Sequence, residues 1–323
     1  MSILILGTVR ENQAEDKGKD KMEKKHKGIK ERKTRNNKRK KLIQYMSLFL
    51  VLLLACGGVA LAGKKPEKKE KKKAVGTQAK NEKNKKKVQK KEGKKEDTRA
   101  KEFAVDPARP VGNPKATDEK VVYLTFDDGP SKLTEEILDI LDEYDAKATF
   151  FVVGHEPDYA YMIKEAHKRG HTIGMHSYSH DYQKIYSSKE AYFKDLDKMA
   201  HVVKKQIGYV PCFIRFPGGS SNTASKHTPG IMTELVEDVQ KKGYQYYDWN
   251  SGNWDGAVKT AGELIETGTS WTENNLLFLA HDSATKQTTV DSLRTIIEHY
   301  KDLGYKFRAL DRQTITAHHP VNN

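Results

Sequence analysis

From residue 119 onward, short runs of apolar residues alternate with longer segments in which apolar side chains recur every three or four positions. The short runs predict strands at 121–126, 148–153, 171–175, 212–215, 244–247, 276–280 and 305–309. The longer segments predict helices at 134–144, 157–169, 189–207, 232–242, 261–266 and 290–303. Six or seven such units indicate an α/β fold with a mostly parallel sheet, closed into a small or incomplete β/α barrel. Neither G-x-G-x-x-G nor a Walker loop follows a predicted strand, so nucleotide binding has no support.

The longest apolar run, LIQYMSLFLVLLLACGGVALAG, covers residues 42–63 and carries no charge. Its length fits a transmembrane helix, and the Lys- and Arg-rich segment before it places residues 1–41 in the cytoplasm. Two alternatives stay open: a signal peptide cleaved after Ala60-Leu61-Ala62, and a lipoprotein processed at Cys56. Each predicts export of the C-terminal region, either as a single-pass cell-membrane protein with an extracytoplasmic domain or as a secreted one.

Charge is distributed unevenly along the chain. Residues 1–117 hold 35 Lys and Arg against 14 Asp and Glu, a net charge of +21, whereas the remainder is net −7. Residues 64–117, rich in Lys and Glu, predict a disordered linker, which either lifts the domain at 118–323 off the membrane or holds anionic wall polymers. Because the domain has no basic signature, nucleic acid is not an expected partner. It contains a single cysteine, Cys212, so no disulfide can form within it.

Polar residues follow four of the predicted strands, where a parallel β/α fold places its active site. Asp127 and Asp128, in TFDDGP, would repel each other without a nearby cation, although a polar turn is the plain alternative. His176 and His180, in HSYSH, have an i, i+4 spacing that would stack both rings on one face of a helical turn. Two histidines and a carboxylate form a common site for a divalent ion that activates water.

Two further strand ends carry a cation and an imidazole. Arg215 precedes the turn in RFPGG, and His281 ends the run LLFLAH. Taken alone, the arginine could form a surface ion pair and the histidine could be structural. Because the fold brings all four strand ends to one rim, their convergence favours an active site.

The ordered set TFDDGP, HSYSH, RFPGG and LAH resembles the motifs of the NodB-type polysaccharide deacetylases, carbohydrate esterase family 4, over about residues 119–312. The resemblance implies a distorted, incomplete (β/α) barrel. It also implies that Asp127 is the general base, oriented by Arg215, and that His281 is the general acid. Asp128, His176 and His180 would bind the divalent metal, expected to be Zn²⁺, with Co²⁺ or another divalent ion as the alternative.

The chain departs from the family in its fourth motif, where many relatives have aspartates before a tryptophan and this chain has DWNSGNW. The aspartate that supports the acid histidine is therefore either replaced or supplied by Asp248. Trp249 or Trp254 could wall the acetyl pocket, and a buried aromatic role is equally open. The remaining substrate contacts are expected in the turn formed by Phe216, Pro217 and Gly218.

These residues predict a metal-dependent hydrolase that removes N-acetyl groups from a cell-wall glycan. Peptidoglycan N-acetylglucosamine is preferred because an exported, tethered enzyme needs a polymer nearby. An O-acetyl carbohydrate esterase or a chitooligosaccharide deacetylase would use the same residues. A surface protein that binds glycan without turnover is the alternative from another class, although a complete set of ligands, acid and base argues against it.

Overall fold

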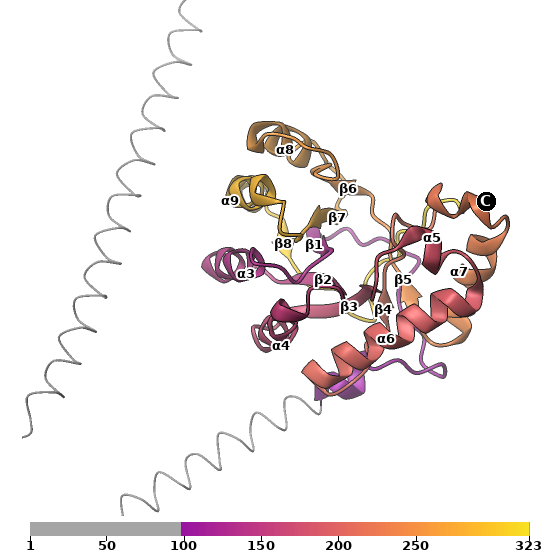
Figure 1. The fold of residues 1–323 in the computed structure, drawn as a ribbon. Helices are drawn as coiled ribbons and strands as arrows, with labels where there is room; N and C mark the ends of the chain where they lie inside the picture. Colours follow the sequence, from indigo (N-terminus) through magenta and orange to yellow (C-terminus); the bar gives the residue numbers. More distant parts are fainter. Residues whose placement is uncertain (1–97, 323) are drawn as a thin grey trace, which may run out of the picture. The chain divides into compact units, whose positions relative to one another are not determined.

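The computed structural model describes residues 98–322 (Figure 1). The predicted cytoplasmic segment 1–41, the apolar segment 42–63 and residues 64–97 of the predicted linker lie outside the described residues. Within 98–322, no helix is both long and apolar enough to cross a membrane. The predicted anchor is therefore not tested by the structure.

An eight-stranded sheet organises the described region, and every strand pairing in it is parallel. The strand order is β5-β4-β3-β2-β1-β7-β6, with β8 paired to the first two residues of β1. No pairing joins the end strands β5 and β6 in the described part of the chain, which confirms the incomplete barrel. The strands are β1 (Val121–Asp127), β2 (Ala148–Val153), β3 (Thr172–Ser177), β4 (Phe213–Ile214), β5 (Gln245–Tyr246), β6 (Ser251–Gly252), β7 (Asn275–His281) and β8 (Lys306–Phe307).

The long strands are buried along almost their whole length. All seven residues of β1 and all six of β2 are buried, as expected for parallel strands covered on both faces. This burial explains why their sequences are continuous apolar runs. By contrast, β4, β5 and β8 each contain only two residues, so the strands predicted there were too long. Strand β6 was not predicted at all.

Helices surround the strands on the outside of the barrel (Figure 1). The long helix α6 spans 189–207, as predicted, and buries one apolar stripe. The predicted helix at 157–169 is divided into a short 3₁₀ turn and α4, while α5 and the turn η2 were not predicted. The helices are α3 (Thr134–Glu143), η1 (Pro157–Tyr159), α4 (Tyr161–Lys168), α5 (Tyr182–Ile185), α6 (Lys189–Ile207), η2 (Ala224–His227), α7 (Ile231–Lys241), α8 (Ala261–Gly268) and α9 (Gln287–Asp302).

Residues 98–117, which precede the expected domain boundary at residue 118, are structured and bonded to the domain. Residues 98–103 are helical, and Arg99 donates hydrogen bonds to the carbonyls of His167 and His171, each at 2.6 Å. Arg312 is buried, and its guanidinium donates to four carbonyls of the segment 102–110. Since buried guanidinium groups need acceptors, residues 98–117 are part of the folded domain.

Candidate active site

Because the strands run parallel, their carboxyl ends meet at one rim, and this rim holds all the predicted polar motifs. Asp127 is the last residue of β1, and His281 is the last residue of β7. The two are register partners in adjacent strands. His176 lies near the end of β3, and Arg215 follows β4. The structure therefore brings together residues more than 150 positions apart in the sequence.

Asp128, His176 and His180 form a cluster whose ligand atoms all lie within 4.8 Å of one another. Asp128 Oδ1 is 3.5 Å from His176 Nε2 and 3.2 Å from His180 Nε2. This oxygen is buried and has no hydrogen-bond partner among the described residues. Burial lowers the pKa of His176 to about 3, which keeps its imidazole neutral, as a metal ligand requires. An orphaned carboxylate oxygen and converging imidazoles fit a divalent cation.

The histidine pair does not lie on a helical turn, so that prediction was wrong. His176 belongs to β3, whereas His180 lies in an irregular segment with φ = 52°. Asp128 also has a positive φ, 68°, as does Trp254 at 56°. Non-glycine residues rarely adopt this region, and such strain gathers at functional sites. The ligands converge because the loops bend sharply, not because a helix spaces them.

Asp127 is paired with a fully buried arginine. Arg215 Nη1 donates to Asp127 Oδ1 at 2.8 Å and to Thr125 Oγ1 at 2.7 Å. Its Nε donates to the carbonyl of Tyr247 at 2.8 Å, and its Nη2 to that of Asp248 at 3.0 Å. Burial raises the pKa of Asp127, and the Arg215 charge opposes that rise. The carboxylate is thus held in one orientation, with its basicity increased.

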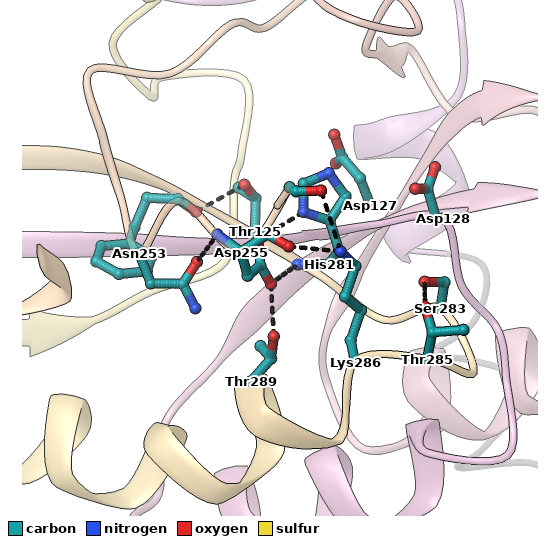
Figure 2. A network of polar contacts seen from close by, with 12 residues as sticks. Thr125, Asp127, Asp128, Asn253, Asp255, His281, Ser283, Thr285, Lys286 and Thr289 are labelled. Carbon is teal, nitrogen blue, oxygen red and sulfur yellow. Dashed lines mark hydrogen bonds and ion pairs between the residues drawn. The ribbon is translucent and has the colours of Figure 1, made fainter. Parts of the chain in front are cut away.

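His281 is supported by Asp255, which the sequence analysis missed. His281 Nδ1 lies 2.6 Å from Asp255 Oδ1, and the other oxygen of Asp255 accepts from Thr289 Oγ1 at 2.6 Å (Figure 2). Burial lowers the pKa of His281, but the hydrogen bond and charge of Asp255, aided by Asp127, outweigh burial and raise that pKa. The available signal in the sequence was an aspartate next to a tryptophan, since Asp255 directly follows Trp254 at the end of the divergent fourth motif.

Asp248 does not support His281, which was the alternative that the sequence left open. Its carboxylate accepts from the backbone N–H of Ser220 at 2.8 Å and from that of His319 at 2.8 Å. It therefore ties the turn after β4 to the C-terminal tail. Trp249 lies beside this turn, where a Cβ on Gly219 would come within 3.0 Å of its ring. Gly219 has φ = 80°, so glycine suits both the backbone and the close approach.

The other predicted substrate contacts differ in accessibility. The side chain of Phe216 is fully buried against Tyr192 and Tyr246, so only main-chain groups at this position could meet a ligand. Pro217 is also buried, while Gly218 is exposed at the rim. Trp254 is 42% exposed and packs edge to face with Trp271 at 5.9 Å between centroids. It is therefore not a buried core aromatic.

Comparisons with known proteins agree on one family. A family model described as polysaccharide deacetylase matches residues 114–246. A peptidoglycan-N-acetylglucosamine deacetylase of Bacillus cereus is 32% identical over 215 residues, covering 64% of this chain and 73% of that protein. The catalytic domain of a peptidoglycan N-acetylglucosamine deacetylase from Eubacterium rectale is 44% identical, with a TM-score of 0.63, covering 68% of this chain and 100% of that one. A Bacillus cereus polysaccharide deacetylase structure is 31% identical, with a TM-score of 0.54 over 63% of this chain and 97% of its own.

Proposed function

The chain belongs to the polysaccharide deacetylase family, and on that basis we propose that it uses a divalent metal to remove N-acetyl groups from a cell-wall glycan. Family membership makes it a hydrolase of amide C–N bonds. Metal dependence, the residue roles and the substrate are the parts that we propose. Peptidoglycan N-acetylglucosamine is the preferred substrate because relatives that share about a third or more of their residues with this chain carry that name.

Asp128, His176 and His180 would hold the metal ion. A bound Zn²⁺ would lower the pKa of a water molecule to about 7 and polarise the acetyl carbonyl. Both imidazoles direct Nε2 toward Asp128 Oδ1, and the carboxylate oxygen lacks any other partner within residues 98–322. The donor set of two nitrogens and one oxygen suits Zn²⁺ and also Co²⁺.

The single observation that carries the mechanism is the placement of Asp127 and His281 as register partners in adjacent strands, beside the cluster of Asp128, His176 and His180. Asp127 would accept the proton of the attacking water, since its carboxylate is held by Arg215 and its pKa is raised by burial. His281 would then donate a proton to the departing sugar amine. Its raised pKa keeps it protonated closer to neutral pH. Acetate and a free glucosamine amine would result.

The turn after β4 would line the acyl side of the site. The main-chain N–H groups of Phe216 and Gly218 are the candidates for donating to the tetrahedral oxyanion, because Pro217 has no N–H and that of Gly219 donates to the Phe216 carbonyl at 2.8 Å. Trp249 would pack against the acetyl methyl group, because its ring lies beside this turn and 5.8 Å from the Arg215 guanidinium. Gly218, exposed at the rim, leaves room for the sugar chain.

We further propose that the domain acts outside the cytoplasmic membrane, anchored by residues 42–63 or released after cleavage. The proposal rests on the apolar run, its basic flank and the wall location of the preferred substrate. The Lys-rich segment after the run would serve as a spacer or contact anionic wall polymers. Protease treatment of intact cells should remove the deacetylase domain if it lies outside, and spare it if it lies inside.

The decisive experiment measures acetate release from purified peptidoglycan by the full-length chain, before and after chelation and after Zn²⁺ is restored. Asp127→Asn, which keeps the shape but not the charge, should abolish release, while Asp158→Asn at an exposed position of η1 should not. Release that survives chelation would contradict the metal role. Release from O-acetylated xylan but not from peptidoglycan or chitooligosaccharides would assign the site to an esterase.

A further inference from the structure

The two histidines of the cluster are held by different means. His176 is part of β3, and its Nδ1 lies 2.8 Å from the carbonyl oxygen of Arg215. His180 lies beyond the strand, where neither sheet nor helix fixes its backbone. A metal ligand in an irregular segment keeps its place only if other groups hold that segment.

The carboxylate of Asp195 holds this segment through four hydrogen bonds. Oδ2 accepts from Ser177 Oγ at 2.6 Å and from the Tyr178 N–H at 2.7 Å. Oδ1 accepts from the Ser179 N–H at 3.0 Å and from Ser179 Oγ at 2.6 Å. Ser177 Oγ in turn accepts from the His180 N–H at 2.9 Å. A continuous set of hydrogen bonds therefore connects Asp195 to the backbone of His180.

Asp195 itself is fixed by the core rather than by the loop. It lies in α6, a helix of 19 residues whose first turn is capped by the Ser188 side chain. Its neighbours Tyr192 and Leu196 are buried, as is Met199 one turn later. The position of the carboxylate is thus set by helix packing, so that it acts as an anchor for residues 177–180.

We propose that Asp195 is a positioning residue that preorganises His180 and thereby sets the affinity of the site for its divalent cation. This inference rests on the metal-dependent function proposed above. Asp195 lies outside all of the sequence motifs and 15 positions beyond His180. Partners that orient metal ligands typically control affinity by 10- to 100-fold.

The chemistry of the contacts requires a carboxylate. Two of the four donors are backbone N–H groups, one on each oxygen, and an N–H cannot reverse its role. In Asp195→Asn, the amide can be oriented in two ways. In either orientation its NH₂ group, a donor, faces one of these backbone N–H donors. At least one contact is then lost and the loop is released, although the side chain keeps its size.

The test uses the full-length chain freed of metal. The Zn²⁺ dissociation constant is measured by competition with a chromophoric chelator, and the visible spectrum of the Co²⁺-loaded chain reports ligand geometry. Asp195→Asn should weaken Zn²⁺ binding by about 10- to 100-fold and change the Co²⁺ spectrum. Asp197→Asn, at an exposed position of the same helix, is the matched control and should change neither.

A second, milder variant keeps the inference testable if Asp195→Asn does not fold. Ser179→Ala removes one of the four contacts and should weaken Zn²⁺ binding by less than Asp195→Asn does. A merely structural role would lower the melting temperature equally with and without Zn²⁺, whereas a positioning role reduces the increment that Zn²⁺ adds. Unchanged affinity and spectrum in Asp195→Asn would overturn the inference. Failure of the unaltered chain to bind Zn²⁺ or Co²⁺ would instead overturn the metal-dependent function on which it rests.

Discussion

His281 Nδ1 and Asp255 Oδ1 lie 2.6 Å apart, and Asp255 also accepts from the backbone N–H of His281 at 2.9 Å. Asp255 itself is almost fully buried, and its pKa is lowered by His281 and Thr289 despite that burial. The carboxylate therefore stays ionised and fixes which nitrogen of His281 faces the rim. This pair determines both the orientation and the pKa of the proposed general acid.

Asp255→Asn should move the alkaline limb of the pH–rate profile to lower pH. A general acid works while protonated, so activity falls as pH rises through its pKa. The hydrogen bond and charge of Asp255 raise the pKa of His281 against the effect of burial, so loss of that charge should lower the limb. The kcat/KM profile for acetate release measures this shift.

Thr289→Val is the matched control for the charge of Asp255. It removes one hydrogen bond to Asp255 but leaves the carboxylate beside His281. Its alkaline limb should stay close to that of the unaltered chain. An alkaline limb unchanged in Asp255→Asn would mean that His281 is not the acid that sets it.

Arg215→Met should impair both stability and catalysis. It leaves Asp127 buried without its cation, which typically costs about 3–5 kcal/mol. Because Arg215 opposes the rise in the pKa of Asp127, that pKa should climb further and move the acid limb to higher pH. Activity at neutral pH should fall by about 10²-fold or more.

Arg294→Met provides the comparison for an exposed arginine. Arg294 pairs with Glu143 at 3.0 Å on the surface, where such pairs contribute about 0–1 kcal/mol. Urea unfolding should separate the two variants clearly. Equal stability of Arg215→Met and Arg294→Met would show that the buried pair is dispensable to the fold.

A chain that begins at residue 118 should be less stable than one that begins at residue 98. The shorter chain loses Phe103, which is buried and packs edge to face with Phe213, and it removes the carbonyl acceptors of Arg312. Loss of a buried Phe and of hydrogen bonds to a buried guanidinium should cost about 3–5 kcal/mol. Chemical unfolding of both chains checks this, and equal midpoints would contradict the role assigned to 98–117.

The sequence predicted the long elements and the motif residues well, for physical reasons. Strands β1, β2 and β7 are buried along almost their full length, so they appear as continuous apolar runs. Asp127 and His281 could be placed together because parallel strands end at one rim. The two-residue strands were poorly predicted, because so few pairings leave no periodic pattern.

What the sequence did not predict depends on contacts between distant positions. The inclusion of residues 98–117 in the domain rests on hydrogen bonds from Arg312 to carbonyls about 200 positions earlier, which leave no local signal in the sequence. The support of His281 by Asp255 depends on a loop that returns to β7. The i, i+4 histidine spacing was misinterpreted because β3 continues through His176, so the second histidine is placed by a loop.

Trp249→Ala should weaken selection for the acetyl group, and this change tests the proposed acyl pocket. The indole is held by the close approach of Gly219 and by His319, which packs edge to face at 4.9 Å and lies 2.6 Å from the Trp249 carbonyl through its Nε2. Without the indole, the pocket should accept a longer acyl chain. One methylene group in such a pocket typically changes the ratio of kcat/KM between two substrates by about 10- to 200-fold. Comparing kcat/KM for N-acetyl and N-propionyl chitooligosaccharides should show the ratio falling toward one.

Trp254→Ala, at the exposed tryptophan, should lower both rates alike if that ring contacts the sugar. A ratio unaffected in Trp249→Ala but altered in Trp254→Ala would assign the pocket wall to Trp254 instead, since only the group that touches the acyl chain can sense its length.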